Sequence, residues 1–187
     1  MTMARLLALL FCLFAGWPAA AWDLKKANIH PTTGKGSFYL CSVEPLDVRT
    51  LLALDHPRIE RVTLCAKCSE RDPGIVSFHL GTTTAPAKDF SIKSFNASVY
   101  IDDKLADALP LTFAVSPDHT SNVFLEAYRT AGDTNLRNTL KLLTALRFAQ
   151  QSLTFDFSGS KLTFNARNVG SAAQKFANSC ALKLPVE

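Results

Sequence analysis

The sequence places its most reactive side chains in four cysteines that follow the first 21 residues: Cys41, Cys65, Cys68 and Cys180. An even number of cysteines in an exported chain is typical of a disulfide framework, and four cysteines allow three pairings. We favour Cys41 with Cys180 and Cys65 with Cys68, because the first pair closes a long loop and restricts the unfolded chain most. The second pair requires a turn between its cysteines, since an extended C-x-x-C holds its Cα atoms about 10 Å apart. The pairing of Cys41 with Cys65 and of Cys68 with Cys180 stays open.

The C-x-x-C spacing of Cys65 and Cys68 also permits thiol–disulfide exchange. A redox pair usually has its first cysteine at a helix N-terminus, where backbone amides stabilise the thiolate. Here a strand-like segment, 59–64, precedes the motif and a turn-like segment, 69–74, follows it. We therefore favour a structural disulfide and keep a thiol–disulfide oxidoreductase that uses Cys65 and Cys68 as the alternative.

No other motif predicts a catalytic, metal or cofactor site. The histidines at 30, 56, 79 and 119 are too scattered to complete a zinc site with the cysteines. The signatures of serine hydrolases, zinc proteases and nucleotide-binding loops are missing. The polar segment 116–122 and the carboxylates Asp89, Asp102 and Asp103 are interpreted as solvated turns. We expect no catalytic residue, no metal and no cofactor.

The first 21 residues have the pattern of a secretory signal peptide. Arg5 is their only charge, an apolar run from Leu6 to Trp17 follows, and three alanines precede position 22. The run is shorter than the roughly 20 residues that cross a bilayer. We therefore expect cleavage after residue 21, removal of Cys12 with the signal, and one periplasmic or secreted domain over 22–187 without a transmembrane segment.

The charge of the chain is weak and interspersed. The 187 residues contain 20 Lys and Arg against 16 Asp and Glu, a net charge of +4. Oppositely charged residues alternate along the chain, as in Arg58, Glu60 and Arg61. Such a pattern is typical of a solvated surface and excludes a nucleic-acid-binding surface as the main function.

Alternation of apolar and polar residues predicts strands in the first two thirds of the chain. A change of parity at Ser94 and Phe95 predicts a bulge. The expected strands lie near 38–43, 62–64, 76–80, 90–101, 111–115 and 123–127, with a turn at Pro73-Gly74.

The last third predicts a helix, a hairpin and a second helix. Leucines at helical spacing indicate a helix over 135–149, with Asp133 and Asn135 as capping candidates. The runs 153–157 and 162–166 flank a short turn with a glycine, as in a hairpin. The second helix has one apolar face, formed by Ala173, Phe176, Ala177 and Cys180. We predict a mainly β fold with α: an antiparallel sheet or sandwich with a helix–hairpin–helix C-terminal part.

The order of elements over 97–180 resembles the invasion-associated locus B family of small exported bacterial proteins. The likeness is in the strand 97–103, the leucine-rich helix 136–149, the hairpin 153–164 and the small-residue start of the last helix at 170–173. The family's Gly-Cys pair between sheet and helix is missing, so the disulfide pattern must differ. The resemblance implies a periplasmic, largely β protein with an accessory role in envelope or host interaction.

We therefore expect a non-catalytic exported interaction or binding protein of the bacterial envelope, whose partner is another protein or an envelope component. An inhibitor or immunity protein against a secreted toxin or a wall-degrading enzyme is a further alternative. It requires a protruding loop, and 82–89 and 116–122 are the candidates.

Overall fold

Strands dominate the part of the chain that the computed structural model describes, which comprises residues 22–51, 59–82, 94–106, 111–115, 123–127 and 133–184. The mainly β character and the antiparallel sheet that the sequence predicts are confirmed. In chain order the described elements are β1 (Asp23–Ala27), β2 (Ser37–Asp47), β3 (Ile59–Ser69), β4 (Asp72–Thr82), β5 (Ser94–Ile101), β6 (Lys104–Leu105), β7 (Leu111–Val115), β8 (Val123–Ala127), α2 (Asp133–Leu146), β9 (Ser152–Phe157), β10 (Ser160–Asn165) and α3 (Val169–Ser179).

One antiparallel sheet contains all the described strands, in the order β1-β2-β3-β4-β8-β7-β5-β9-β10, with β6 paired to β5. β5 connects two parts of this sheet, because its first half pairs with β7 and its second half with β9. The predicted bulge at Ser94 and Phe95 is not found, because these residues pair in continuous register with Ala114 and Phe113 of β7.

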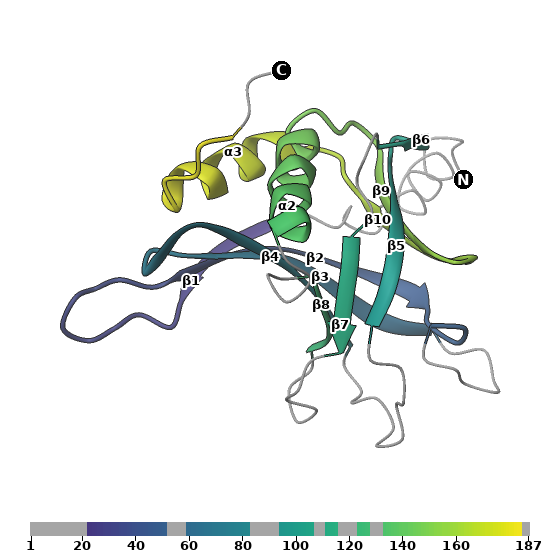
Figure 1. Cartoon of the computed structure of the whole chain (residues 1–187), viewed down its shortest axis with the longest axis horizontal. Helices are drawn as coiled ribbons and strands as arrows, with labels where there is room; N and C mark the ends of the chain where they lie inside the picture. Colours follow the sequence, from purple (N-terminus) through teal and green to yellow (C-terminus); the bar gives the residue numbers. More distant parts are fainter. Residues whose placement is uncertain are drawn as a thin grey trace, which may run out of the picture.

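The two ends of the sheet approach one another. β10 lies against β2, although six strands separate them along the sheet order. The backbone N–H of Asn165 donates to Glu44 Oε1 at 3.1 Å, and the Trp22 indole donates to the Asn165 carbonyl at 2.7 Å. In Figure 1, β5, β9 and β10 rise from the plane of β2–β4, so the sheet is strongly curled, and α2 contacts it at β4 and β7.

The predicted alternation is visible in the burial of β3. Val62, Leu64 and Ala66 are fully buried, whereas the residues between them are partly or fully exposed. The two described helices lie on the buried side, where α2 contacts β4 and α3 contacts β2 and β1 (Figure 1). We call this side of β1–β4 the inner face and the opposite side the outer face.

α2 is held by apolar contacts and by the buried amide of Asn135. Leu143 and Leu146 are fully buried, in agreement with the predicted leucine face, and Leu142 is fully buried as well. Asn135, a predicted capping candidate, lies inside the helix and is 3 % exposed. Its Oδ1 accepts from the backbone N–H of Thr112 and its Nδ2 donates to the Thr112 carbonyl, both at 3.1 Å. Asn135 therefore joins α2 to β7 instead of capping the helix.

The predicted hairpin is formed by β9 and β10. Its turn residues, Ser158 and Gly159, both have positive φ, as a two-residue hairpin turn of the I′ type requires. β9 also pairs with β5, so the hairpin is part of the main sheet. A helix–hairpin–helix unit at the C-terminus is therefore not confirmed, although α3 buries the predicted face with Ala173, Phe176 and Ala177.

The favoured disulfide pairing is wrong, and the alternative is observed: Cys41 is bonded to Cys65 and Cys68 to Cys180. The physical reason is that β3 continues through the whole C-x-x-C, without the turn that a bond between Cys65 and Cys68 needs. Residues three apart on a strand face opposite sides. Cys65 therefore lies on the outer face, directly opposite Cys41 of β2, and Cys68 lies on the inner face under α3.

Candidate functional site

The outer face of β1–β4 carries polar side chains at the positions that alternate with the core. They include Tyr39 and Cys41 of β2, Cys65 and Lys67 of β3, and Ser77 and His79 of β4. The register of the strands brings them together, because Lys67 pairs with both Tyr39 and Ser77, and Cys65 pairs with both Cys41 and His79.

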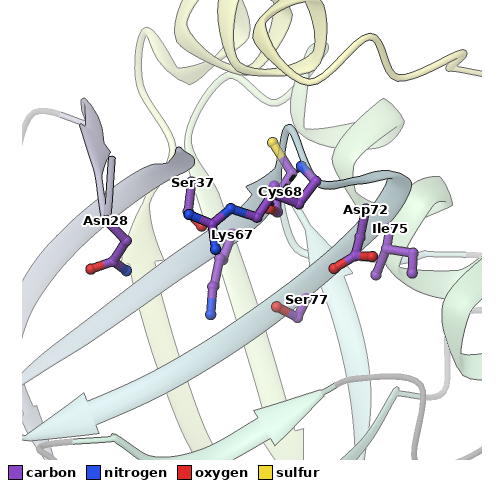
Figure 2. Close-up of a pocket in the computed structure, with 9 residues that line it drawn as sticks. Asn28, Ser37, Lys67, Cys68, Asp72, Ile75 and Ser77 are labelled. Atoms are coloured by element: carbon purple, nitrogen blue, oxygen red, sulfur yellow. Dashed lines mark hydrogen bonds between the residues drawn. The ribbon is translucent and has the colours of Figure 1, made fainter. Parts of the chain in front are cut away.

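A pocket of about 500 Å³ opens at one end of this face. It is bounded by the end of β1, the start of β2 and the turn between β3 and β4. Figure 2 shows Lys67, Ser77, Asp72 and Asn28 around one space, while the sulfur of Cys68 points away from it. The lining residues are mostly polar: Asn28, Ser37, Lys67, Cys68, Ser69, Arg71, Asp72, Ile75 and Ser77.

An irregularity in the sheet shapes the rim of the pocket. The register between β3 and β4 shifts after Cys68, so that Ser69 pairs with Asp72. The tight turn between them places Arg71 at the rim, where its backbone N–H donates to Ser69 Oγ at 3.1 Å. The predicted turn at Pro73-Gly74 therefore lies earlier than expected, and Gly74 falls within β4 with a φ of 89°.

The carboxylate of Glu70, next to Arg71 in the chain, is bound by groups other than the two pocket cations, Lys67 and Arg71. Glu70 accepts from Lys26 Nζ at 2.8 Å and from the Gly36 N–H at 2.6 Å. These hydrogen bonds and the charge of Lys26 lower the pKa of Glu70. Within the described residues, Lys67 and Arg71 have no carboxylate oxygen within 4 Å, although Asp72 also lines the pocket. The pocket therefore contains two cations and one carboxylate.

An aromatic ring orients Lys67. The Nζ atom lies 5.8 Å from the centroid of the Tyr39 ring, within the range of a cation–π contact. Tyr39 is held in turn by Asn28, whose Nδ2 donates to the phenolic oxygen at 2.9 Å. These contacts join β1, β2 and β3 and position the ammonium group beside the pocket.

Ser77, which lines the pocket, is hydrogen-bonded to His79 on the same strand. Ser77 Oγ lies 2.6 Å from His79 Nε2, and the serine is 5 % exposed. Burial of the imidazole, and secondarily the charge of Lys67, lowers the pKa of His79 to about 4. The imidazole is therefore neutral near pH 7. The sequence carries a signal for this pair, since residues two apart on a strand share a face.

The redox site that the C-x-x-C spacing permits is not formed in the structure. Cys65 and Cys68 are bonded to different partners on opposite faces of the sheet, so they do not form one dithiol. This finding corrects the oxidoreductase alternative.

Asp102 has a structural role that the sequence did not reveal. It lies with Asp103 at the β5–β6 turn, and both residues have positive φ. The carboxylate of Asp102 accepts from the backbone N–H groups of Gln150, Gln151 and Ser152 at 2.7 to 3.0 Å. Burial raises the pKa of this carboxyl, but the three N–H groups and Lys104 outweigh burial and lower it. Asp102 therefore fastens the connection between α2 and β9 to the sheet.

Several predicted features lie outside the described residues: the signal segment 1–21, Asp89, and the loops 82–89 beyond Thr82 and 116–122. Within the described residues, no three His, Cys, Asp or Glu side chains are close enough to hold a metal ion. No helix among them is long and apolar enough to cross a membrane.

Comparisons of the chain with models of known protein families, with curated proteins and with solved structures found no match. The resemblance to the invasion-associated locus B family therefore depends on the order of elements alone and stays a prediction.

Proposed function

We propose that this chain is a non-catalytic exported interaction protein of the bacterial envelope, periplasmic or secreted, and that it binds another protein or an envelope component. We place the binding surface on the outer face of β1–β4, centred on the pocket beside Lys67. The resemblance to the invasion-associated locus B family supports the envelope part of this proposal.

One observation carries the proposal. The pocket holds the side chains of Lys67 and Arg71, and within the described residues neither has a carboxylate within 4 Å. Its volume of about 500 Å³ lies within the range that ligand sites commonly have. Polar groups that converge on a cavity, with their charge available, are typical of recognition sites.

The disulfides are compatible with export. Disulfides persist in oxidising compartments and are rare in the cytosol. One of them, between Cys41 and Cys65, lies on the outer face and joins β2 to β3, which both contribute to the pocket. The bond holds these strands in register, so the binding surface is pre-organised.

Photo-crosslinking tests the location of the binding surface. A photoreactive residue replaces Ile75, which lines the pocket, and in a second protein it replaces Thr163, which is exposed on β10. We expect a discrete crosslinked product in intact envelopes from position 75 only. The charge reversal Lys67→Glu with Arg71→Glu should abolish it.

The matched control reverses two exposed lysines elsewhere, Lys161→Glu in β10 with Lys175→Glu in α3. It makes the same change in net charge and should leave the crosslinked product intact. Equal crosslinking from positions 75 and 163, or equal loss in both charge-reversal variants, would contradict the proposed surface.

A further inference from the structure

We infer that the pocket on the outer face binds an oxyanion, the carboxylate or phosphate group of a ligand, between Lys67 and Arg71. The inference rests on the proposed function, because it names the chemical class that the same pocket would recognise. Three observations carry it.

The first observation is the balance of donors and acceptors around the pocket. Lys67 and Arg71 supply only donors, and Asn28, Ser37 and Ser77 supply further N–H or O–H groups. Asp72 is the one carboxylate among the lining residues. The planar fork of an arginine matches two oxygens of a carboxylate or phosphate, while a lysine adds a point charge.

The second observation is that Glu70, next to Arg71 in the chain, is engaged by other groups, and that Asp72 forms no ion pair with Lys67 or Arg71 among the described residues. Asp23 pairs with Lys25 at 2.7 Å, and Glu70 pairs with Lys26 and with the Gly36 N–H. The two pocket cations are thus not neutralised by these groups. The charge of Lys67 also acts on the neighbouring imidazole of His79, whose protonated form it disfavours.

The third observation is that the ammonium group of Lys67 is held in position before a ligand binds. Tyr39 lies under the Lys67 ammonium, and Asn28 fixes the tyrosine hydroxyl. Ser77 also lines the pocket, and its hydroxyl is held by the hydrogen bond with His79. A ligand oxygen therefore meets side chains that are already ordered, which lowers the entropy that binding costs.

The test uses inorganic phosphate and acetate as probes, with the protein over 22–187 and its disulfides intact. Backbone amide shifts are followed by NMR during titration, and sodium chloride at matched ionic strength is the reference. We expect at least one anion to give saturable shifts confined to the residues that line the pocket and their chain neighbours, at 28, 37, 67–72 and 75–77. Tighter binding of phosphate indicates a phosphorylated ligand, and tighter binding of acetate indicates a carboxylate ligand.

Lys67→Met and Arg71→Met should each lower the affinity for the more tightly bound anion by about tenfold, since each substitution removes a charge-assisted contact. Arg71→Lys retains the charge and should recover part of the affinity. Lys161 provides the matched control, because its Nζ lies 5.8 Å from the Tyr100 ring, as Lys67 does from Tyr39. Lys161→Met should bind like the unmodified protein.

The inference is overturned if neither anion saturates, if chloride produces the same shifts, or if Lys161→Met weakens binding as much as Lys67→Met. Its failure differs from failure of the proposed function. If crosslinking from position 75 persists while no anion binds, the outer face binds a partner by other chemistry.

Discussion

The lowered pKa of His79 predicts that acid destabilises the folded protein. Its neutral ring contacts Ser77 at 2.6 Å, and its pKa is lowered from 6.5 to about 4 by burial and by Lys67. In the unfolded chain the ring takes up a proton near pH 6.5, whereas in the folded protein it does so only near pH 4. The unfolded state therefore binds more protons between these values, and stability falls as the pH falls through this range.

We expect the free energy of unfolding to decrease by about 2 kcal/mol between pH 7.5 and pH 5 through His79 alone. Urea unfolding of the unmodified protein and of His79→Gln at both pH values measures this effect. The variant should lose most of the difference between the two pH values. An unchanged pH dependence in the variant would show that the imidazole titrates normally in the folded protein.

Asp102 stabilises a connection through its charge. Its carboxylate accepts three backbone N–H groups, from Gln150, Gln151 and Ser152. Asp102→Ala should lower the free energy of unfolding by about 2 kcal/mol, because three donors lose a charged acceptor. Asp103→Ala is the matched control, since Asp103 has the same left-handed backbone, whereas the three N–H groups donate to Asp102. Equal effects of the two substitutions in thermal unfolding would assign the loss to backbone strain.

Among the elements, α3 contributes a buried face and one end of a disulfide. Phe176 is 0 % exposed, and Cys180 follows the helix and bonds to Cys68 of β3. Phe176→Ala should cost about 3 to 5 kcal/mol, through lost apolar contact and the cavity left behind. Lys175→Ala, on the exposed side of the same helix, should have little effect. If both variants shift the denaturant midpoint equally little, α3 does not support the sheet.

The elements also show what the sequence predicts well. The apolar face of α3 and the alternation of Val62, Leu64 and Ala66 follow directly from spacing, because burial on one side imposes the period of the helix or strand. The disulfide pairing was missed for a related reason. The loop-closure argument considered only the unfolded chain, whereas the strand through Cys65 and Cys68 forces their side chains to opposite faces.

The pocket could not be predicted from the sequence, for a different reason. Its lining residues are at 28, 37, 67–69, 71, 72, 75 and 77, and they meet only through the register of β1–β4 and the shift after Cys68. Register depends on the whole sheet and is not encoded in any one segment. Only the short-range part of the site, Ser77 and His79 on one strand, has a local signature.

At the scale of the whole molecule, the two disulfides have different tasks. Cys41 and Cys65 are half-buried and join adjacent strands on the outer face, 24 residues apart. Cys68 and Cys180 are 2 % and 3 % exposed and join β3 to the end of α3, 112 residues apart. The second bond therefore connects the first hairpins of the sheet to the C-terminal helix, and the core covers it.

The difference predicts an order of reduction. A thiolate must reach a sulfur atom to attack it, so a mild thiol reductant should open the Cys41–Cys65 bond first. Trapping of free thiols by alkylation, followed by peptide mass spectrometry, identifies the bond that opens. Simultaneous reduction, or earlier reduction of the Cys68–Cys180 bond, would contradict the burial of the second disulfide.

Loss of the buried Cys68–Cys180 bond should lower the free energy of unfolding more than loss of the Cys41–Cys65 bond, although the buried bond is reduced later. The loop closed by Cys68 and Cys180 is longer, so in the chain-entropy account its bond restricts the unfolded state by about 5 kcal/mol, against about 3 kcal/mol for the shorter loop. Replacement of both cysteines of a pair by serine or alanine leaves no free thiol, and urea unfolding gives the two losses. Cys68→Ala with Cys180→Ala should therefore destabilise more than Cys41→Ser with Cys65→Ser, because it also releases α3 from the sheet. A larger loss from the outer pair would mean that the register of β2 and β3, and with it the shape of the pocket, depends on the Cys41–Cys65 bond more than the core depends on α3.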